Sequence, residues 1–121
     1  MDITLKRQAD RAIADLVEHG GGTYEPRTLL PFEPTDGYAV GVGGVTIPEA
    51  GCTSDVLAWA ARAVAGEYIT SYVGTWLNDG VVYIDAVRYV KDLNRAFVIG
   101  QGASQRAVYG FAEKEAIEVP S

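Results

Sequence analysis

The chain has very few of the residues from which metal sites and disulfides are built. Among its 121 residues there is one cysteine, Cys52, and one histidine, His19. A lone cysteine cannot form a disulfide within the chain, and these two residues are too few for a structural zinc site. We therefore expect no metal site and no cofactor. The fold should be stabilised by the burial of apolar side chains alone.

Cationic charge and long apolar runs are also scarce. The chain has 10 Lys and Arg against 16 Asp and Glu, which gives a formal net charge of -6. Nucleic acids and anionic lipids are bound by clustered Lys and Arg, so this balance disfavours direct nucleic-acid binding and membrane contact. No apolar run reaches the roughly 18 residues of a membrane span, and the first residues, MDITLKRQAD, lack the hydrophobic stretch of a signal peptide. These features predict a cytoplasmic protein.

The apolar content is high enough for one compact domain, at 48% of the residues. Residues 1–22 predict an amphipathic helix, because apolar residues recur at spacings of three and four until the glycine run at 20–22 ends the helix. Residues 23–37 contain three prolines and read as an ordered connector, since Leu29, Leu30 and Phe32 give it apolar side chains to bury. Residues 38–121 form the rest of the domain.

The pattern from residue 38 onward alternates between strands and helices. We expect a strand or tight hairpin at 38–47, and then a helix that is capped by Thr53 or Ser54 and ends at Gly66. Strands at 67–77 and 81–90, a helix after Asp92, and strands at 106–111 and 116–119 are expected to follow. This order predicts an α+β fold. Its antiparallel sheet would have two helices on one face, in the ferredoxin-like (split βαβ) order, with the N-terminal helix added.

The two central strands are joined at Asn78-Asp79-Gly80, a strong hairpin signal. A two-residue turn at Asp79-Gly80 pairs Trp76 with Tyr83 and Gly74 with Asp85, and a three-residue loop would shift the register by one. With the two-residue turn, side-chain alternation separates two chemically coherent faces. The aliphatic face carries Ile69, Val73, Leu77, Val82, Ile84, Ala86 and Val90, and the aromatic face carries Tyr68, Tyr72, Trp76, Tyr83, Val87 and Tyr89 together with Asp85.

The aromatic face has three possible uses. It is an internal second core if the N-terminal helix covers it, which would give that helix's apolar stripe a partner. It is an interface with another protein, or with a second copy of the chain, if it is uncovered, since Tyr and Trp are enriched at binding hot spots. The third use, a stacking platform for single-stranded nucleic acid, requires a basic rim that this acidic chain scarcely has.

Asp85 is the one residue whose expected position suggests an unusual environment. A carboxylate in the middle of a strand, on an aromatic face, is expected to be partly desolvated, which would raise its pKa. We expect a structural hydrogen bond to a tyrosine hydroxyl, Arg88 or Arg106 in preference to a catalytic role. No other residue has a pattern typical of catalysis, since His19 is expected at a helix end and Cys52 has no ionisable partner nearby. No catalytic residue is therefore assigned.

From Asp36 onward the chain contains the segments DGYAVGVGG, YVGTWLNDGVVYIDAV, a DLNRA helix and SQRAVYGF ahead of AIEV. Over residues 37–119 this pattern resembles a group of small uncharacterised proteins of actinobacteria and their phages. The resemblance implies no activity and no site residues. It does imply a context, namely an acidic accessory protein of a bacterium or of a mobile element.

These observations together predict a non-enzymatic protein–protein interaction module. One version of this prediction is an accessory or inhibitor protein of a phage or mobile element. The partner would be another protein or a second copy of this chain. The predicted interaction residues are Tyr68, Tyr72, Trp76, Tyr83, Asp85 and Tyr89. The alternative is a small-ligand-binding protein or small enzyme with a pocket around Asp85 and the neighbouring tyrosines.

Overall fold

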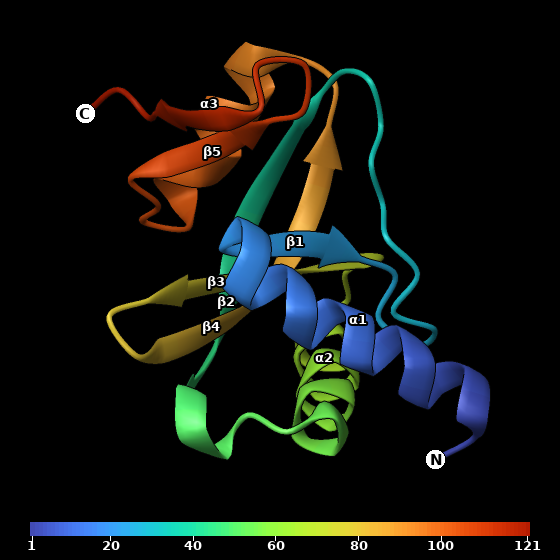
Figure 1. The fold of residues 1–121 in the computed structure, drawn as a ribbon. Helices are drawn as coiled ribbons and strands as arrows, with labels where there is room; N and C mark the ends of the chain where they lie inside the picture. The colour runs from blue at the N-terminus through green and yellow to red at the C-terminus, as the bar shows by residue number, and fades with distance from the viewer.

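Six antiparallel strands form one curled sheet, a half-barrel, in a computed structural model that describes residues 1–121 (Figure 1). Along the sheet the strand order is β1-β3-β4-β2-β5-β6. The elements are α1 (Ile3–His19), β1 (Gly21–Tyr24), β2 (Tyr38–Pro48), the short 3-10 helix η1 (Glu49–Gly51), α2 (Ser54–Tyr68), β3 (Tyr72–Asn78), β4 (Val81–Val90), α3 (Leu93–Gly102), β5 (Ala107–Gly110) and β6 (Glu115–Glu118). The predicted α+β class with an antiparallel sheet is confirmed.

The sheet is larger and more curved than the predicted arrangement. A strand that sequence reasoning did not expect, β1, pairs with β3 through residues 21–24, part of which we assigned to the connector. The helices also pack in two separate groups, with α1 and α2 in one hydrophobic cluster and α3 in another. The more detailed prediction, a ferredoxin-like sheet with two helices on one face, is therefore not confirmed.

Helix boundaries follow the capping residues. Asp2, Thr53 and Asp92 each accept a hydrogen bond from a backbone N–H in the first turn of α1, α2 and α3. Gly20 ends α1 in the left-handed conformation, with φ of 82°. The predicted end of α2 at Gly66 is wrong, because the helix continues to Tyr68 and ends at Ile69, whose φ is 54°. One glycine in an alanine-rich helix costs about 1 kcal/mol, which the packing of α2 outweighs.

The register predicted for the central hairpin is confirmed. Trp76 pairs with Tyr83, and Gly74 pairs with Asp85. Both central turn residues have positive φ, 52° for Asp79 and 75° for Gly80, as a two-residue turn of this kind requires. The strand predicted at 67–77 is shorter than expected, because β3 begins only at Tyr72.

The main core lies on the aliphatic face, and α1 and α2 cover it. The buried members from the two helices are largely alanines, which let the helices approach each other and the sheet closely. The fully buried sheet residues in this cluster are Tyr24, Val73, Val82, Ile84 and Ala86. The α1 helix thus finds the partner that its apolar stripe requires in α2 and the aliphatic face. The possibility that it covers the aromatic face is wrong.

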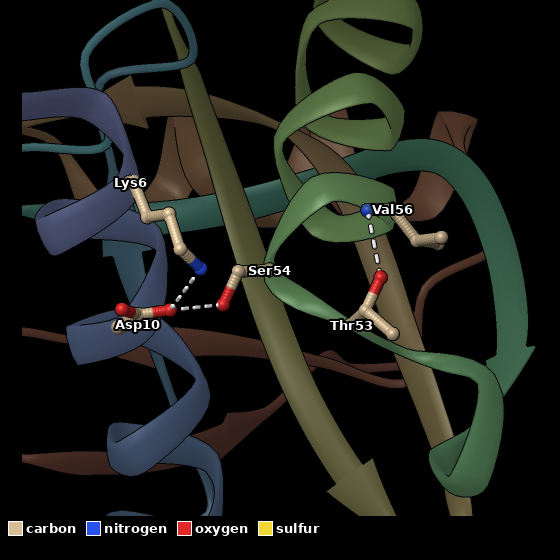
Figure 2. Close-up of polar contacts among 5 residues, drawn as sticks. All are labelled: Lys6, Asp10, Thr53, Ser54 and Val56. Atoms are coloured by element: carbon tan, nitrogen blue, oxygen red, sulfur yellow. Dashed lines mark hydrogen bonds and ion pairs between the residues drawn. The ribbon is translucent and has the colours of Figure 1, made fainter. Parts of the chain in front are cut away.

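Polar contacts also join α1 to the beginning of α2. The Ser54 hydroxyl donates to the Asp10 carboxylate, and the Lys6 ammonium lies 3.5 Å from the same carboxylate oxygen (Figure 2). In the same view, the Thr53 side chain caps α2 through the Val56 N–H. These exposed contacts fix how the two helices meet at one end. The hydrogen bond from Ser54 is the first cause of a lowered pKa at Asp10.

Candidate binding site on the aromatic face

The strand register arranges the aromatic face in rows across the sheet. Residues directly paired on neighbouring antiparallel strands point to the same face, so each row can be read from the pairing. The first row, nearest the hairpin turn, is Gly21, Trp76, Tyr83 and Thr46. The second row is Thr23, Gly74, Asp85 and Gly44. The third row is Tyr72, Val87 and Gly41. The second row therefore has a carboxylate flanked by glycines, between rows that carry aromatic rings.

The half of this face farthest from the hairpin turn is covered. The Phe32 ring, from the connector between β1 and β2, stacks on Tyr72 with 3.9 Å between centroids. It also makes edge contacts with Tyr89 and with Phe111 from the β5–β6 turn. The Tyr89 hydroxyl donates to the Asp36 carbonyl over 2.9 Å, which ties the connector down. An internal second core thus exists on this half, built by Phe32 and Phe111.

The half nearest the hairpin turn is open. Trp76 is 58% exposed although it lies on a strand whose two neighbours, β1 and β4, are both paired with it. Tyr83, beside it on β4, is half-buried. An indole left this exposed on a sheet face contributes little to the core. Trp76 and Tyr83 form the part of the predicted interaction surface that remains accessible.

Tyr68 does not belong to the aromatic face. It is the last residue of α2, and its ring fills the space where a β-carbon at Gly43 would lie. Gly43 pairs with Ala86, a residue of the aliphatic face. The predicted place of Tyr68 on the aromatic face is therefore wrong. Its cause is the longer α2, which takes Tyr68 and Ile69 out of the predicted strand.

Asp85 lies in a space that glycines leave free. A β-carbon at Gly44 would lie 2.6 Å from the Oδ1 atom of Asp85, and one at Gly41 would lie 3.7 Å from its Cβ atom. Only glycine at position 44 lets the carboxylate rest against β2 in this way. Gly74, the partner of Asp85 on β3, has no side chain either. The carboxylate is half-buried, with backbone on both sides.

The expected internal hydrogen bond of Asp85 is absent. Burial alone raises the pKa of its carboxyl group, and no hydrogen bond or nearby cation contributes to the shift. Arg88 pairs with Val40 on the opposite face, and the Tyr89 hydroxyl is bound to Asp36. Half-burial of a carboxylate without a partner costs free energy. Asp85 therefore has the capacity to accept hydrogen bonds from a group outside the chain.

Gln105 is a neighbour of this site that sequence reasoning did not find. Its Oε1 atom would lie 3.4 Å from a β-carbon at Gly41, and its side-chain nitrogen donates to the Ala103 carbonyl over 3.4 Å. The oxygen end of the amide is thus directed toward the glycine that also adjoins Asp85. Gln105 belongs to the loop between α3 and β5, and no spacing in the sequence links it to β4.

A further surface hollow lies next to this site and shares Gln105 with it. It measures about 1000 Å³ and is lined by exposed polar residues near the C-terminus, among them Gln101, Arg106 and Glu118. These side chains are solvated. We regard the surroundings of Asp85 as the better candidate site. A ligand that pairs with a partly desolvated carboxylate gains more free energy than one that displaces water from solvated side chains.

The remaining candidates have no arrangement suited to chemistry. His19 is exposed at the end of α1, and burial raises the pKa of the Cys52 thiol, which disfavours the reactive thiolate. No group of three or more His, Cys, Asp and Glu side chains is placed to hold a metal ion. None of the helices combines the length and apolar character needed to cross a membrane.

Comparison with known proteins yields no relative of this chain. No protein-family model, curated protein or solved structure matches it. The resemblance to actinobacterial and phage proteins stays a prediction.

Proposed function

We propose that this protein acts by binding another protein through the open half of its aromatic face, formed by Trp76, Tyr83 and Asp85. The observation that carries the proposal is the 58% exposed indole of Trp76, one row away from a carboxylate that has no partner within the chain. A large aromatic beside a desolvated polar group is the usual composition of an interface hot spot.

The covered half of the face supports this surface from behind. Phe32, Tyr72, Tyr89 and Phe111 hold one another in stacked and edge contacts, so the strands beneath the open half are fixed. A rigid surface loses little conformational entropy on binding, which favours affinity. Tyr72 and Tyr89, predicted as interaction residues, act in this proposal as supports for the surface.

The alternative function, a ligand-binding protein or enzyme that uses Asp85 with tyrosine hydroxyls, has less support. The Tyr89 hydroxyl is occupied by Asp36, and no tyrosine hydroxyl donates to Asp85. A general acid or base requires a second group placed to act with it. The aromatic rings are better placed to provide contact area.

Site-specific photo-crosslinking in the cell of origin tests the proposal. A photoreactive phenylalanine analogue replaces Trp76 in one variant and Trp59 in a matched control, since Trp59 is 71% exposed on α2. We expect a protein adduct that forms from position 76 only, decreases when Tyr83→Ala is added, and is displaced by excess unlabelled protein. Equal adducts from both positions, or none, would disprove an interface at Trp76. A dimer of the chain itself would identify a second copy as the partner.

Two finer expectations are retained as proposals. The strand order β3-β4-β2-β5 supports a split βαβ core to which β1 and β6 are added. The setting, a cytoplasmic accessory or inhibitor protein of a phage or mobile element, is supported by the sequence resemblance alone. The function proposed above depends on neither expectation.

A further inference from the structure

Two side chains that carry acceptors and receive no hydrogen bond within the chain lie near Gly41. One is Asp85, whose Cβ atom would lie 3.7 Å from a β-carbon at that glycine and whose Oδ1 atom lies against Gly44. The other is Gln105, whose Oε1 atom would lie 3.4 Å from the same position. No cation of the chain is near enough to affect the pKa of Asp85. A group that satisfies both acceptors has to bring hydrogen-bond donors, and a positive charge would also neutralise the carboxylate.

Aromatic rings lie in the rows on either side of Asp85. Trp76 and Tyr83 occupy the row toward the hairpin turn, and Tyr72 lies in the row on the other side. The positions next to Asp85 across the sheet are Gly74 and Gly44, so neither paired residue has a side chain. On the Gly74 side the Cγ2 atom of Val87 would lie 3.1 Å from a β-carbon at that glycine, so the space beside the carboxylate is freer toward Gly44. A cation above an aromatic ring is stabilised by the electron-rich ring face, most strongly at tryptophan.

From this arrangement we infer that the partner inserts a lysine or arginine side chain at Asp85, with its cationic end near the carboxylate and its aliphatic part against Trp76. This inference rests on the proposed function and specifies the chemistry of the partner. The net charge of -6 favours the approach of a basic partner surface. An unpaired carboxylate is unfavourable in the free protein, so its neutralisation occurs only in the complex and adds to affinity.

Titration with single amino acid derivatives, followed by two-dimensional NMR, tests the inference on the full chain. The probes are N-acetyl-arginine amide and N-acetyl-lysine amide. The matched neutral probes are N-acetyl-citrulline amide and N-acetyl-norleucine amide. We expect at least one cationic probe to shift the amide signals of Gly41, Gly44 and Gly74 and the indole signal of Trp76, while its neutral counterpart binds at least about tenfold more weakly.

Substitutions then assign the effect to the carboxylate. Asp85→Asn should weaken the cationic probe by about tenfold or more, because the amide keeps the shape of the side chain and loses its charge. Asp55→Asn, at an exposed aspartate in the first turn of α2, serves as the control and should leave the affinity unchanged. Asp85→Ser is the second variant, with the same expected loss, in case the asparagine variant does not fold.

The outcomes separate this inference from the proposed function. If charged and neutral probes bind equally, or if Asp85→Asn binds the cation as well as the wild type, the inferred cation site is wrong. Crosslinking from position 76 would still support the protein interface in that case. The opposite result, a cation site without any adduct from position 76, would disprove the protein interface and identify a site for small amines.

Discussion

The two faces of the central hairpin have the same backbone and opposite roles. Val82, Ile84 and Ala86 on the aliphatic face are fully buried under α1 and α2, whereas Trp76 on the aromatic face is 58% exposed. The main core comprises 15 buried residues, and the aromatic face contributes a cluster of only three. Stability thus depends mainly on one face. The other face is free to retain features that cost stability, such as an exposed indole and an unpaired carboxylate.

The two faces differ in burial because different elements cover them. Two amphipathic helices supply continuous apolar stripes to the aliphatic face, and their alanines allow close contact. The aromatic face receives one ring from the connector, Phe32, and one from the β5–β6 turn, Phe111. Two rings are enough to cover Tyr72 and Tyr89, but they leave Trp76 exposed. Incomplete cover is therefore what creates the candidate site.

The largest expected effect contrasts the two faces directly. Ile84→Ala on the aliphatic face should lower the free energy of unfolding by about 3 kcal/mol, since it removes a fully buried side chain and leaves a cavity. Trp76→Ala on the aromatic face should change it by less than about 1 kcal/mol, because most of the indole is already in water. Urea denaturation of both variants measures the contrast. Similar losses would show that the aromatic face is part of the main core.

A medium effect tests the cover of the aromatic face. Phe32→Ala should cost about 2 kcal/mol, because the half-buried ring stacks on Tyr72 and meets two further rings. Leu30→Ala is the control in the same connector, and its 51% exposed side chain should cost less than about 0.5 kcal/mol. Thermal melts compare the two variants. Equal stability for both would mean that Phe32 does not hold the connector to the sheet.

The arrangement of the hairpin was predictable because its determinants are local. The turn at Asp79-Gly80 sets the register, and alternation then assigns each residue of β4 to a face. The cover of each face was not predictable in this way. The apolar stripe of α1 predicts only that the helix packs against an apolar surface. From the sequence, the aliphatic face and the aromatic face were both suitable surfaces. The choice depends on α2, whose alanines offer α1 a close fit.

The candidate site was only partly predictable for the same reason. Asp85 and Trp76 follow from the register, but Tyr68 was assigned to the wrong element because a single glycine is a weak helix terminator. Phe32 and Gln105 reach the face from a connector and a loop. Contacts of that kind depend on the path of the chain in three dimensions, and no periodicity in the sequence encodes them.

The smallest expected effect concerns pH and the unpaired carboxylate. Burial raises the pKa of Asp85 above its ordinary value of 3.8, so the folded protein holds this proton more tightly than the unfolded chain does. Ionised Asp85 therefore lowers the stability of the fold. This penalty is fully present above the folded-state pKa. It disappears as the pH falls through that pKa to below 3.8, where both states are protonated.

Asp85→Asn cannot ionise, so it should be more stable than the wild type at pH 7 by less than about 1 kcal/mol, given that solvent still screens the carboxylate. The advantage should decrease toward zero as the pH falls to about 4. Asp10→Asn provides a control of opposite sign. The Ser54 hydrogen bond lowers the pKa of Asp10, so the ionised form stabilises the fold above the unfolded-state pKa. That variant should be the less stable one at pH 7. Urea denaturation from pH 4 to 7 measures both differences. If Asp85→Asn were less stable than the wild type at pH 7, the carboxylate would have a hydrogen-bond partner within the chain. The aromatic face would then carry no unpaired carboxylate for a partner to bind.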